Sequence, residues 1–315
     1  MNYPPDLIEE QISSVDKAWE LLNEKLPEFQ VIFDIWHAWF CDIVKDVEVQ
    51  EVVTSTVVVS YARMALRNGT LSIQPRNYHS EKHIDDLIYR LIAVSQLSSS
   101  HFITDYGWAL LSIFMSAHDL RQSEKNNEQE LVGNNEQASF QEVIRILDVV
   151  DQHKIVRQEH KELLKLMIHG STFGRGEDTK GNIYIGNLVK VLLKGVAYFD
   201  DDDKELAYLA CDIDTANVSA DLKDYAQSSI NVYNEIQTIS GNSMSAQLFF
   251  GTLQSDYFFE LQKFNSKVGK QAFAQQKLDN TPKIKKLCSL IQQLDPEMEN
   301  NDVVDYYLLQ INELS

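Results

Sequence analysis

Apolar residues recur at three- and four-residue steps along most of this chain, the spacing that buries one face of an α-helix. Glycine and proline, which interrupt helices, number only 12 and 6 in 315 residues. The pattern therefore predicts an all-α protein folded as a multi-helix bundle. Helices are expected over residues 6–26, 28–45, 50–67, 77–98, 101–121, 138–152, 156–169, 187–198, 203–216, 219–239, 245–270, 283–294 and 300–314.

Several stretches are less regular. The valine-rich residues 50–67 suit a strand by residue preference, but the length of the run and its ending in Tyr61–Leu66 favour a helix. Residues 170–181 hold four glycines without the Lys-Ser/Thr ending of a phosphate-binding loop, so a plain loop is predicted. The polar residues 122–137 predict a loop that is either a surface excursion or a flap over a site. Pro282 predicts a helix break.

The net charge of −19 repels nucleic acid polymers and anionic membranes, but it permits a small phosphorylated substrate beside a bound cation. No apolar run reaches the ~20 residues of a membrane span, and the N-terminus does not resemble a secretory signal. Cys41, Cys211 and Cys288 lack the spacing of a disulfide framework. We therefore expect a single cytoplasmic domain over residues 1–315, and the sequence leaves its oligomeric state open.

Candidate metal ligands gather in the first half of the chain. His79 and His83 fall within the predicted helix 77–98, where a four-residue step places both rings on one face. His118 and Asp119 stand side by side at the end of the next predicted helix. Imidazole nitrogens and carboxylate oxygens bind divalent transition metals. Together these residues predict a site for one divalent cation.

A carboxylate late in an apolar helix adds to this set. Asp212 and Asp214 both lie in the predicted helix 203–216, and a carboxylate among apolar residues is costly unless it is paired or bound to metal. Either one is a candidate ligand. His101 and His169 are further histidines, for which a structural role is expected.

The order of a His, an adjacent His-Asp pair and a distant Asp on helices resembles the HD superfamily of metal-dependent phosphohydrolases, over about residues 77–216. The resemblance implies an HD-like core over about residues 69–240, with helical extensions over 1–68 and 241–315. The apolar residues around the late carboxylate favour Asp212 over Asp214 as the last ligand. The metal ligands that the resemblance implies are His83, His118, Asp119 and Asp212.

Within this superfamily, Tyr78–His83 and Leu209–Ile213 look most like the cyclic-nucleotide phosphodiesterase branch. That likeness implies that His79 is the proton donor and that Asp119 is the second catalytic residue. Gln262 lies near the place where that branch has a purine-reading glutamine, and Arg175 is a candidate to meet a substrate phosphate. Candidates to orient a ring N–H are Glu81, Asp86 and Glu142.

The function that the resemblance implies is hydrolysis of a small, nucleotide-like phosphate ester by metal-activated water, the ion being Mn, Mg, Fe, Ni or Zn. The phosphodiesterase branch continues His-Asp-x-x-His, whereas this chain has Gln122, a poor ligand, so a single-ion site is predicted. The alternative is a catalytically decayed HD scaffold that binds a ligand or regulates a partner. A third reading is a helical interaction protein whose histidines are only packed.

Overall fold

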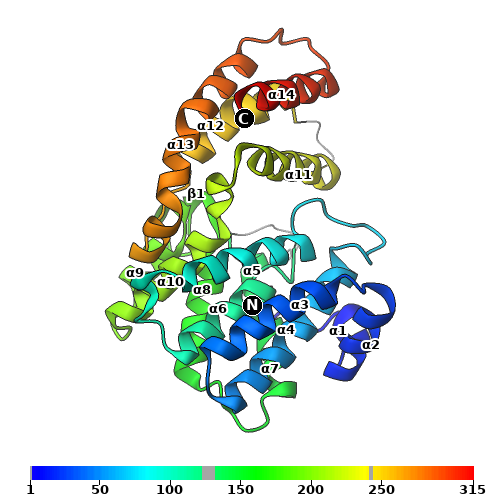
Figure 1. Cartoon of the computed structure of the whole chain (residues 1–315), viewed down its shortest axis with the longest axis vertical. Helices are drawn as coiled ribbons and strands as arrows, with labels where there is room; N and C mark the ends of the chain where they lie inside the picture. The colour runs from blue at the N-terminus through cyan, green and yellow to red at the C-terminus, as the bar shows by residue number, and fades with distance from the viewer. Residues whose placement is uncertain (1, 123–131, 241–243) are drawn as a thin grey trace.

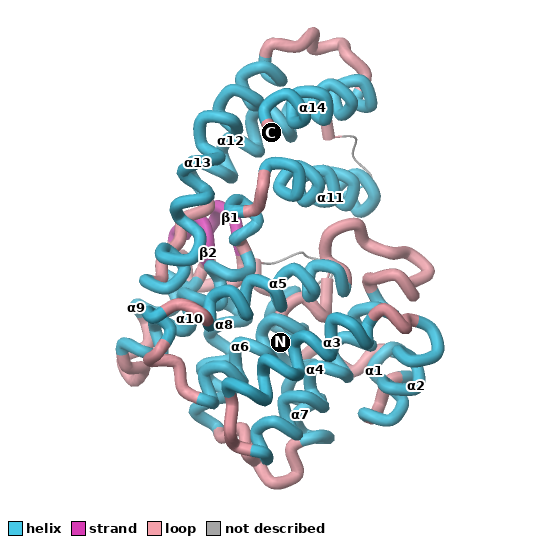
Figure 2. The backbone as a smooth tube through the Cα atoms, in the orientation of Figure 1, coloured by secondary structure: helices cyan, strands magenta, loops and turns pink. Residues whose placement is uncertain are grey.

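The computed structural model describes residues 2–122, 132–240 and 244–315, and the greater part of them is helical (Figures 1 and 2). The all-α class expected from the sequence is confirmed, with one two-stranded hairpin added. The predicted loop over 122–137 lies largely outside the described residues. The α-helices are α1 (Leu7–Gln11), α2 (Val15–Lys25), α3 (Phe29–Ile43), α4 (Val47–Arg67), α5 (Glu81–Ser95), α6 (Asp105–Ala117), α7 (Asn134–Val150), α8 (Gln158–Gly170), α9 (Val189–Lys194), α10 (Asp201–Asp214), α11 (Leu222–Ser240), α12 (Gln254–Asp256), α13 (Lys267–Gln292) and α14 (Asn300–Leu314).

Helices α1 to α8 make the lower part of the molecule in Figure 1, and α11, α13 and α14 make the upper part. The long helix α13 joins the two parts, because it contacts α5 and α10 near its start and α14 near its end. Buried apolar side chains from both parts form one continuous cluster. Among the described residues, no helix is both long and apolar enough to cross a membrane.

Helix α6 lies at the centre of the lower part, where it packs on α4, α5, α8 and α10. Its residues from Gly107 to Ala117 are all buried, and each fully buried large apolar side chain contributes about 1.5–3 kcal/mol. The valine-rich α4 packs along it and is capped by Asp46, whose side chain accepts from the Glu48 and Val49 amides. The helix predicted over 50–67 is confirmed. Because α4 is buried on more than one face, its valines do not form a single apolar face with helical spacing.

Several predicted helix boundaries differ from the structure. The helix expected over 6–26 divides into α1 and α2, because the Ser14 side chain accepts from the Lys17 amide and begins a new helix. Pro282 lies inside α13 instead of breaking it. The carbonyl that loses its hydrogen-bond donor there belongs to Leu278, which is 62% exposed, so water can satisfy it. The helix expected over 245–270 becomes two π-helical segments, η3 (Leu248–Leu253) and η4 (Tyr257–Leu261), flanking α12, and the chain then runs non-helically to α13.

The glycine-rich stretch forms a β-hairpin, not the plain loop expected. Strand β1 (Phe173–Glu177) pairs antiparallel with β2 (Ile183–Asn187). Asp178 closes the turn between them, because one of its oxygens accepts from the amides of Lys180 and Asn182. Gly186 has φ +79°, and a Cβ there would lie 2.5 Å from the Leu261 carbonyl oxygen, so glycine is required.

A buried network of ion pairs ties the first residues of the chain to the segment after α6. Arg67 donates to both oxygens of Asp6, at 2.9 and 3.0 Å, and to the Leu120 carbonyl oxygen at 2.8 Å. Glu142, with its side chain fully buried, lies 3.0 Å from Arg67. Its contacts are with arginines and not with a histidine ring, contrary to the orienting role expected for it. The other arginines paired with Glu9 or Glu142 are Arg63, Arg121 and Arg145.

Candidate metal centre

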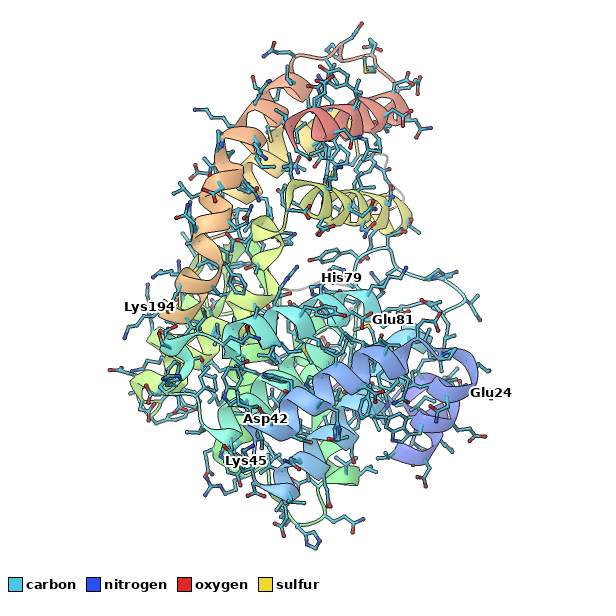
Figure 3. The ribbon with its side chains drawn as sticks, viewed as in Figure 1. Glu24, Asp42, Lys45, His79, Glu81 and Lys194 are labelled. Atoms are coloured by element: carbon cyan, nitrogen blue, oxygen red, sulfur yellow. The ribbon has the colours of Figure 1, made fainter. Side chains whose placement is uncertain are left out.

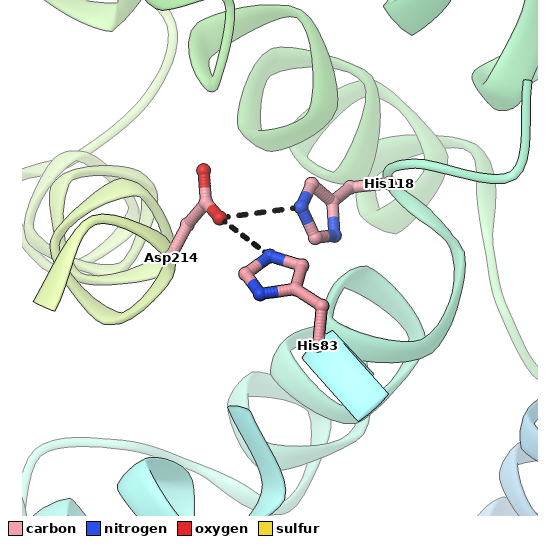
Figure 4. A group of neighbouring side chains, drawn as sticks. All are labelled: His83, His118 and Asp214. Atoms are coloured by element: carbon pink, nitrogen blue, oxygen red, sulfur yellow. Dashed lines mark hydrogen bonds and ion pairs between the residues drawn. The ribbon is translucent and has the colours of Figure 1, made fainter. Parts of the chain in front are cut away.

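Three helices bring two imidazoles and a carboxylate together in the core (Figure 4). His83 lies in the first turn of α5, His118 directly follows α6, and Asp214 is the last residue of α10. Asp214 Oδ1 lies 3.0 Å from His83 Nε2 and 3.4 Å from His118 Nε2. The two histidines are 4% and 2% exposed, so the group is closed on the side of the helices.

Asp119 adds a fourth donor from the turn after α6. Its Oδ2 lies 3.0 Å from His118 Nε2 and 3.8 Å from His83 Nε2. Two ligands that each lie about 2.1 Å from one ion, at right or tetrahedral angles, are about 3.0–3.4 Å apart. Three of the four nitrogen–oxygen distances fall in this range, and the fourth needs a shift of a few tenths of an ångström. His83, His118 and Asp214 could therefore hold one divalent metal ion, and Asp119 lies beside them as a further donor.

The ring of His118 is oriented for this role. Its Nδ1 lies 3.1 Å from the Phe114 carbonyl oxygen, so Nδ1 carries a hydrogen and Nε2 is the atom that faces the carboxylates. Nε2 is buried, and among the described residues it has no hydrogen bond of acceptable geometry. Burial lowers the pKa of His118, but Asp119 and Asp214 outweigh it and raise that pKa well above its ordinary value. The two carboxylates therefore favour binding of a cation at Nε2, either a proton or a metal ion.

Gln122, which departs from the family pattern, supports Asp119. Its side-chain amide donates to Asp119 Oδ1 at 2.9 Å and accepts from Asn135 Nδ2 at 3.2 Å. Asp119 Oδ1 is thus held by Gln122 while Oδ2 faces the imidazoles. Burial raises the pKa of Asp119, but the nearby His118 and His79 outweigh it and hold that pKa at about 2. Asp119 is ionised at neutral pH, as a metal ligand requires.

Asp212, preferred from the sequence, lies elsewhere. Its oxygens accept from the Asn265 amide at 2.9 Å, the Ser266 amide at 2.8 Å and the Ser266 hydroxyl at 2.6 Å, at the N-terminus of α13. Residues two apart on a helix point about 200° apart, so Asp212 and Asp214 cannot face the same site. A Cβ at Gly269 would lie 2.4 Å from Asp212 Oδ2, which shows how closely α13 approaches. The last ligand is therefore corrected from Asp212 to Asp214.

His79 does not share a helical face with His83, because α5 begins only after Ser80. It lies instead in the segment before α5, below α11 (Figure 3). His79 Nδ1 lies 2.6 Å from Glu235 Oε1, and the amides of Tyr78 and His79 donate to Glu235 Oε2 at 2.8 and 3.0 Å. Glu235, on α11, is therefore the residue that orients His79. Sequence reasoning missed it, because an acidic residue 156 positions away in an amphipathic helix carries no local signal.

The ion pair fixes the charge of this histidine. Burial lowers the pKa of His79, but Asp119 and Glu235 outweigh it and raise that pKa above its ordinary value. Burial raises the pKa of Glu235, but His79 outweighs it and holds that pKa at about 2. The ion pair therefore favours the protonated form of His79. The other expected orienting residues are elsewhere: Glu81 accepts from the Thr70 amide, and Asp86 is exposed.

The metal group opens onto a cavity of about 490 Å³, within the size range of small-molecule sites. Asp119, Asp214 and His79 line one end of it. The other end is aromatic and amide-rich, where Tyr257 donates to Asn217 Oδ1 at 2.7 Å. The cavity is also lined by Phe173, Phe249 and Gln254.

The two substrate-binding residues expected from the sequence do not line this cavity. Arg175 lies on β1, is largely exposed and pairs with Asp256 at 3.0 Å. Gln262 is fully buried, and its side-chain oxygen accepts from Lys277 Nζ at 2.6 Å. Gln254 lines the cavity instead, and its Oε1 is buried without a hydrogen-bond partner in the described part of the chain.

Fold and site together define a helical protein with a buried His-His-carboxylate group that can hold one metal ion. Comparison with protein-family models finds no match for this chain, and comparison with curated proteins finds none. The relation to the HD superfamily therefore stays a prediction that rests on the residues described above.

Proposed function

We propose that this chain is a metal-dependent phosphohydrolase of HD type that hydrolyses a small, nucleotide-like phosphate ester. One observation carries the proposal: His83, His118, Asp119 and Asp214 converge beside a cavity that is also lined by His79, a histidine paired with Glu235. A packed helical core does not need this group, because buried carboxylates and imidazoles are costly unless they are paired or bound to metal.

The residues have separate roles in this proposal. His83, His118, Asp214 and Asp119 Oδ2 would hold the ion, which supplies a Lewis acid and lowers the pKa of coordinated water. His79 keeps Nδ1 on Glu235 and presents its other nitrogen to the cavity, where it donates a proton to the leaving oxygen. Proton transfer of this kind contributes about 10²–10⁴ in rate.

The far end of the cavity supports a nucleotide-like substrate. The rings of Tyr257 and Phe249 give flat apolar surface, and the free oxygen of Gln254 is placed to accept a hydrogen bond. A buried acceptor that a substrate satisfies discriminates strongly against substrates that lack the matching donor. A base with an amino or ring N–H group meets this condition, whereas a simple aryl phosphate does not.

The test begins with elemental analysis of the freshly purified protein. It continues with hydrolysis of an aryl phosphate, an aryl phosphodiester and a panel of linear and cyclic nucleotides, with Mn²⁺, Mg²⁺, Ni²⁺ or Zn²⁺ added. We expect turnover of a nucleotide that His118→Ala abolishes. Gln254→Leu should lower turnover of the nucleotide at least tenfold while that of the aryl ester changes less. No turnover on any substrate with any ion would refute the hydrolase proposal.

A second candidate function is a ligand-binding or regulatory protein on the same scaffold, favoured by the contacts of Gln122. Because Gln122 occupies Asp119 Oδ1, that carboxylate is not free to bridge a second ion. This candidate predicts that a nucleotide binds without turnover and that binding survives His118→Ala. Loss of metal and of turnover together in that variant excludes it.

A further inference from the structure

A second cavity, of about 780 Å³, lies apart from the metal group. It lies between α8, α9 and the turn of the β-hairpin, and it shares no lining residue with the metal cavity. Part of its wall is apolar, from Leu166, Val191, Leu192, Val196 and Phe199. A wall of this kind offers burial to an aliphatic or aryl group at about 25 cal/mol per Å².

Cationic side chains surround this apolar wall, in a protein whose net charge is −19. Lys165 reaches it from α8, Lys180 from the hairpin turn and Lys194 from the end of α9, at the edge of the molecule in Figure 3. Within residues 2–122, 132–240 and 244–315, none of these three ammonium groups lies at salt-bridge distance from a carboxylate. Three unpaired lysines around one apolar cavity produce a local positive field.

The acidic residues of the cavity, Glu162 and Asp178, reduce this field, but in the described part of the chain neither lies at salt-bridge distance from the three lysines. Glu162 accepts from the Gln158 side chain at 2.7 Å. Asp178 is engaged in the hairpin turn, where it accepts from two backbone amides and from the Asn182 side chain. Both carboxylates thus have local partners, and the ammonium groups remain available to a ligand.

A histidine in the wall adds an unused polar atom. His169 Nε2 is buried and has no hydrogen-bond partner in the described part of the chain. Burial, together with the neighbouring Lys165, lowers the pKa of His169 to about 4, so the ring is neutral at pH 7. A neutral imidazole offers either a donor or an acceptor according to its tautomer, and it suits an anionic oxygen as the donor.

We propose that this cavity is a second binding site, for an amphipathic anion that has an apolar aliphatic or aryl body and one carboxylate or phosphate group. The apolar body lies against Leu166, Val191 and Phe199. The anionic group meets Lys165, Lys180 and Lys194, beside the ring of His169. The inference does not depend on the function of the metal centre.

The test is a fluorescence titration of the full chain with a dansyl-labelled undecanoate, compared with its uncharged methyl ester. We expect the acid to bind at least tenfold more tightly than the ester, and high salt to reduce that difference. Lys180→Glu/Lys194→Glu should weaken the acid at least tenfold. The control Lys285→Glu/Lys286→Glu makes the same charge change at exposed positions on α13 and should have less than a twofold effect.

A second variant tests the apolar wall. Val196→Trp fills the cavity and should weaken acid and ester alike, while circular dichroism and metal content stay unchanged. The proposal is overturned if the ester binds as well as the acid, if Val196→Trp leaves both affinities unchanged, or if the control pair weakens binding as much as the cavity pair.

Discussion

The pair Asp214→Asn and Asp212→Asn gives opposite results if the ligand assignment is right. Both substitutions replace a carboxyl group on α10 by an amide of the same shape. Asp214 lies 3.0 and 3.4 Å from two imidazole nitrogens, whereas Asp212 accepts backbone and hydroxyl hydrogens at the start of α13. The first change should therefore affect metal binding, and the second should affect folding stability.

The size of each effect follows from these contacts. Loss of a residue that only supports a metal ligand costs about 10- to 100-fold in affinity, so loss of the Asp214 ligand itself should cost at least about 100-fold, or about 2.7 kcal/mol. Hydrogen bonds to a charged group contribute about 1.5–3 kcal/mol each, and an asparagine keeps part of them. Asp212→Asn should thus lower the free energy of unfolding by about 1–3 kcal/mol.

Titration calorimetry with Zn²⁺ and Mn²⁺ measures the affinities, and urea unfolding in the presence of a chelator measures the stabilities. We expect Asp214→Asn to lose metal affinity, and any loss of metal-free stability comes from its contacts with the two imidazoles. Asp212→Asn should keep its affinity within about threefold of the unaltered chain and unfold at lower urea concentration. If Asp212→Asn loses the metal and Asp214→Asn retains it, the assignment is wrong.

Three other substitutions follow from the same contacts. Glu235→Gln removes a carboxylate that raises the pKa of His79, so that pKa should fall. The alkaline limb of any pH–rate profile should then move to lower pH. An unchanged titration of His79, followed by NMR, would contradict this expectation. Gln122→Ala frees Asp119 and should weaken metal binding about 10- to 100-fold by calorimetry, and an unchanged affinity would exclude a supporting role. Arg67→Met removes the ion pairs of Arg67 with Asp6 and with the fully buried Glu142 and should cost about 3–5 kcal/mol in urea unfolding, whereas a loss below 1 kcal/mol would show that the network is dispensable.

Long apolar periodicity predicted the helices well, because their stability comes from burial of one face. The helix expected over 300–314 coincides with α14, and the valine-rich α4 was recognised from its length and its ending. The boundaries were harder, since they depend on single side chains. The Glu235 side chain accepts from the amides of Tyr78 and His79, and α5 begins only at Glu81, so His79 lies outside the helix on which the sequence pattern placed it.

The candidate site could be predicted in part. His83, His118 and Asp119 follow from residue types and order, and the structure brings all three together. The choice between Asp212 and Asp214 could not be made, because apolar neighbours surround both and only the position of α13 separates them. Glu235 and Gln254 could not be found either, since their contacts join segments distant in sequence.

The hairpin shows a different limit. Ile183 and Ile185 are exposed, at 76% and 53%, while Tyr184 between them is buried. The apolar residues of β2 therefore face away from the core, and the pattern that usually marks a half-buried strand is inverted. The glycines of β1 have no side chain, so β1 shows no alternation of apolar and polar residues.

Anomalous diffraction from crystals grown with Mn²⁺ or Zn²⁺ tests the central claim most directly, because it locates the ion. The account predicts one strong peak about 2.0–2.3 Å from His83 Nε2, His118 Nε2 and an oxygen of Asp214, with Asp119 Oδ2 next nearest. The absence of a peak at these four residues, or a peak coordinated by Asp212, would contradict it.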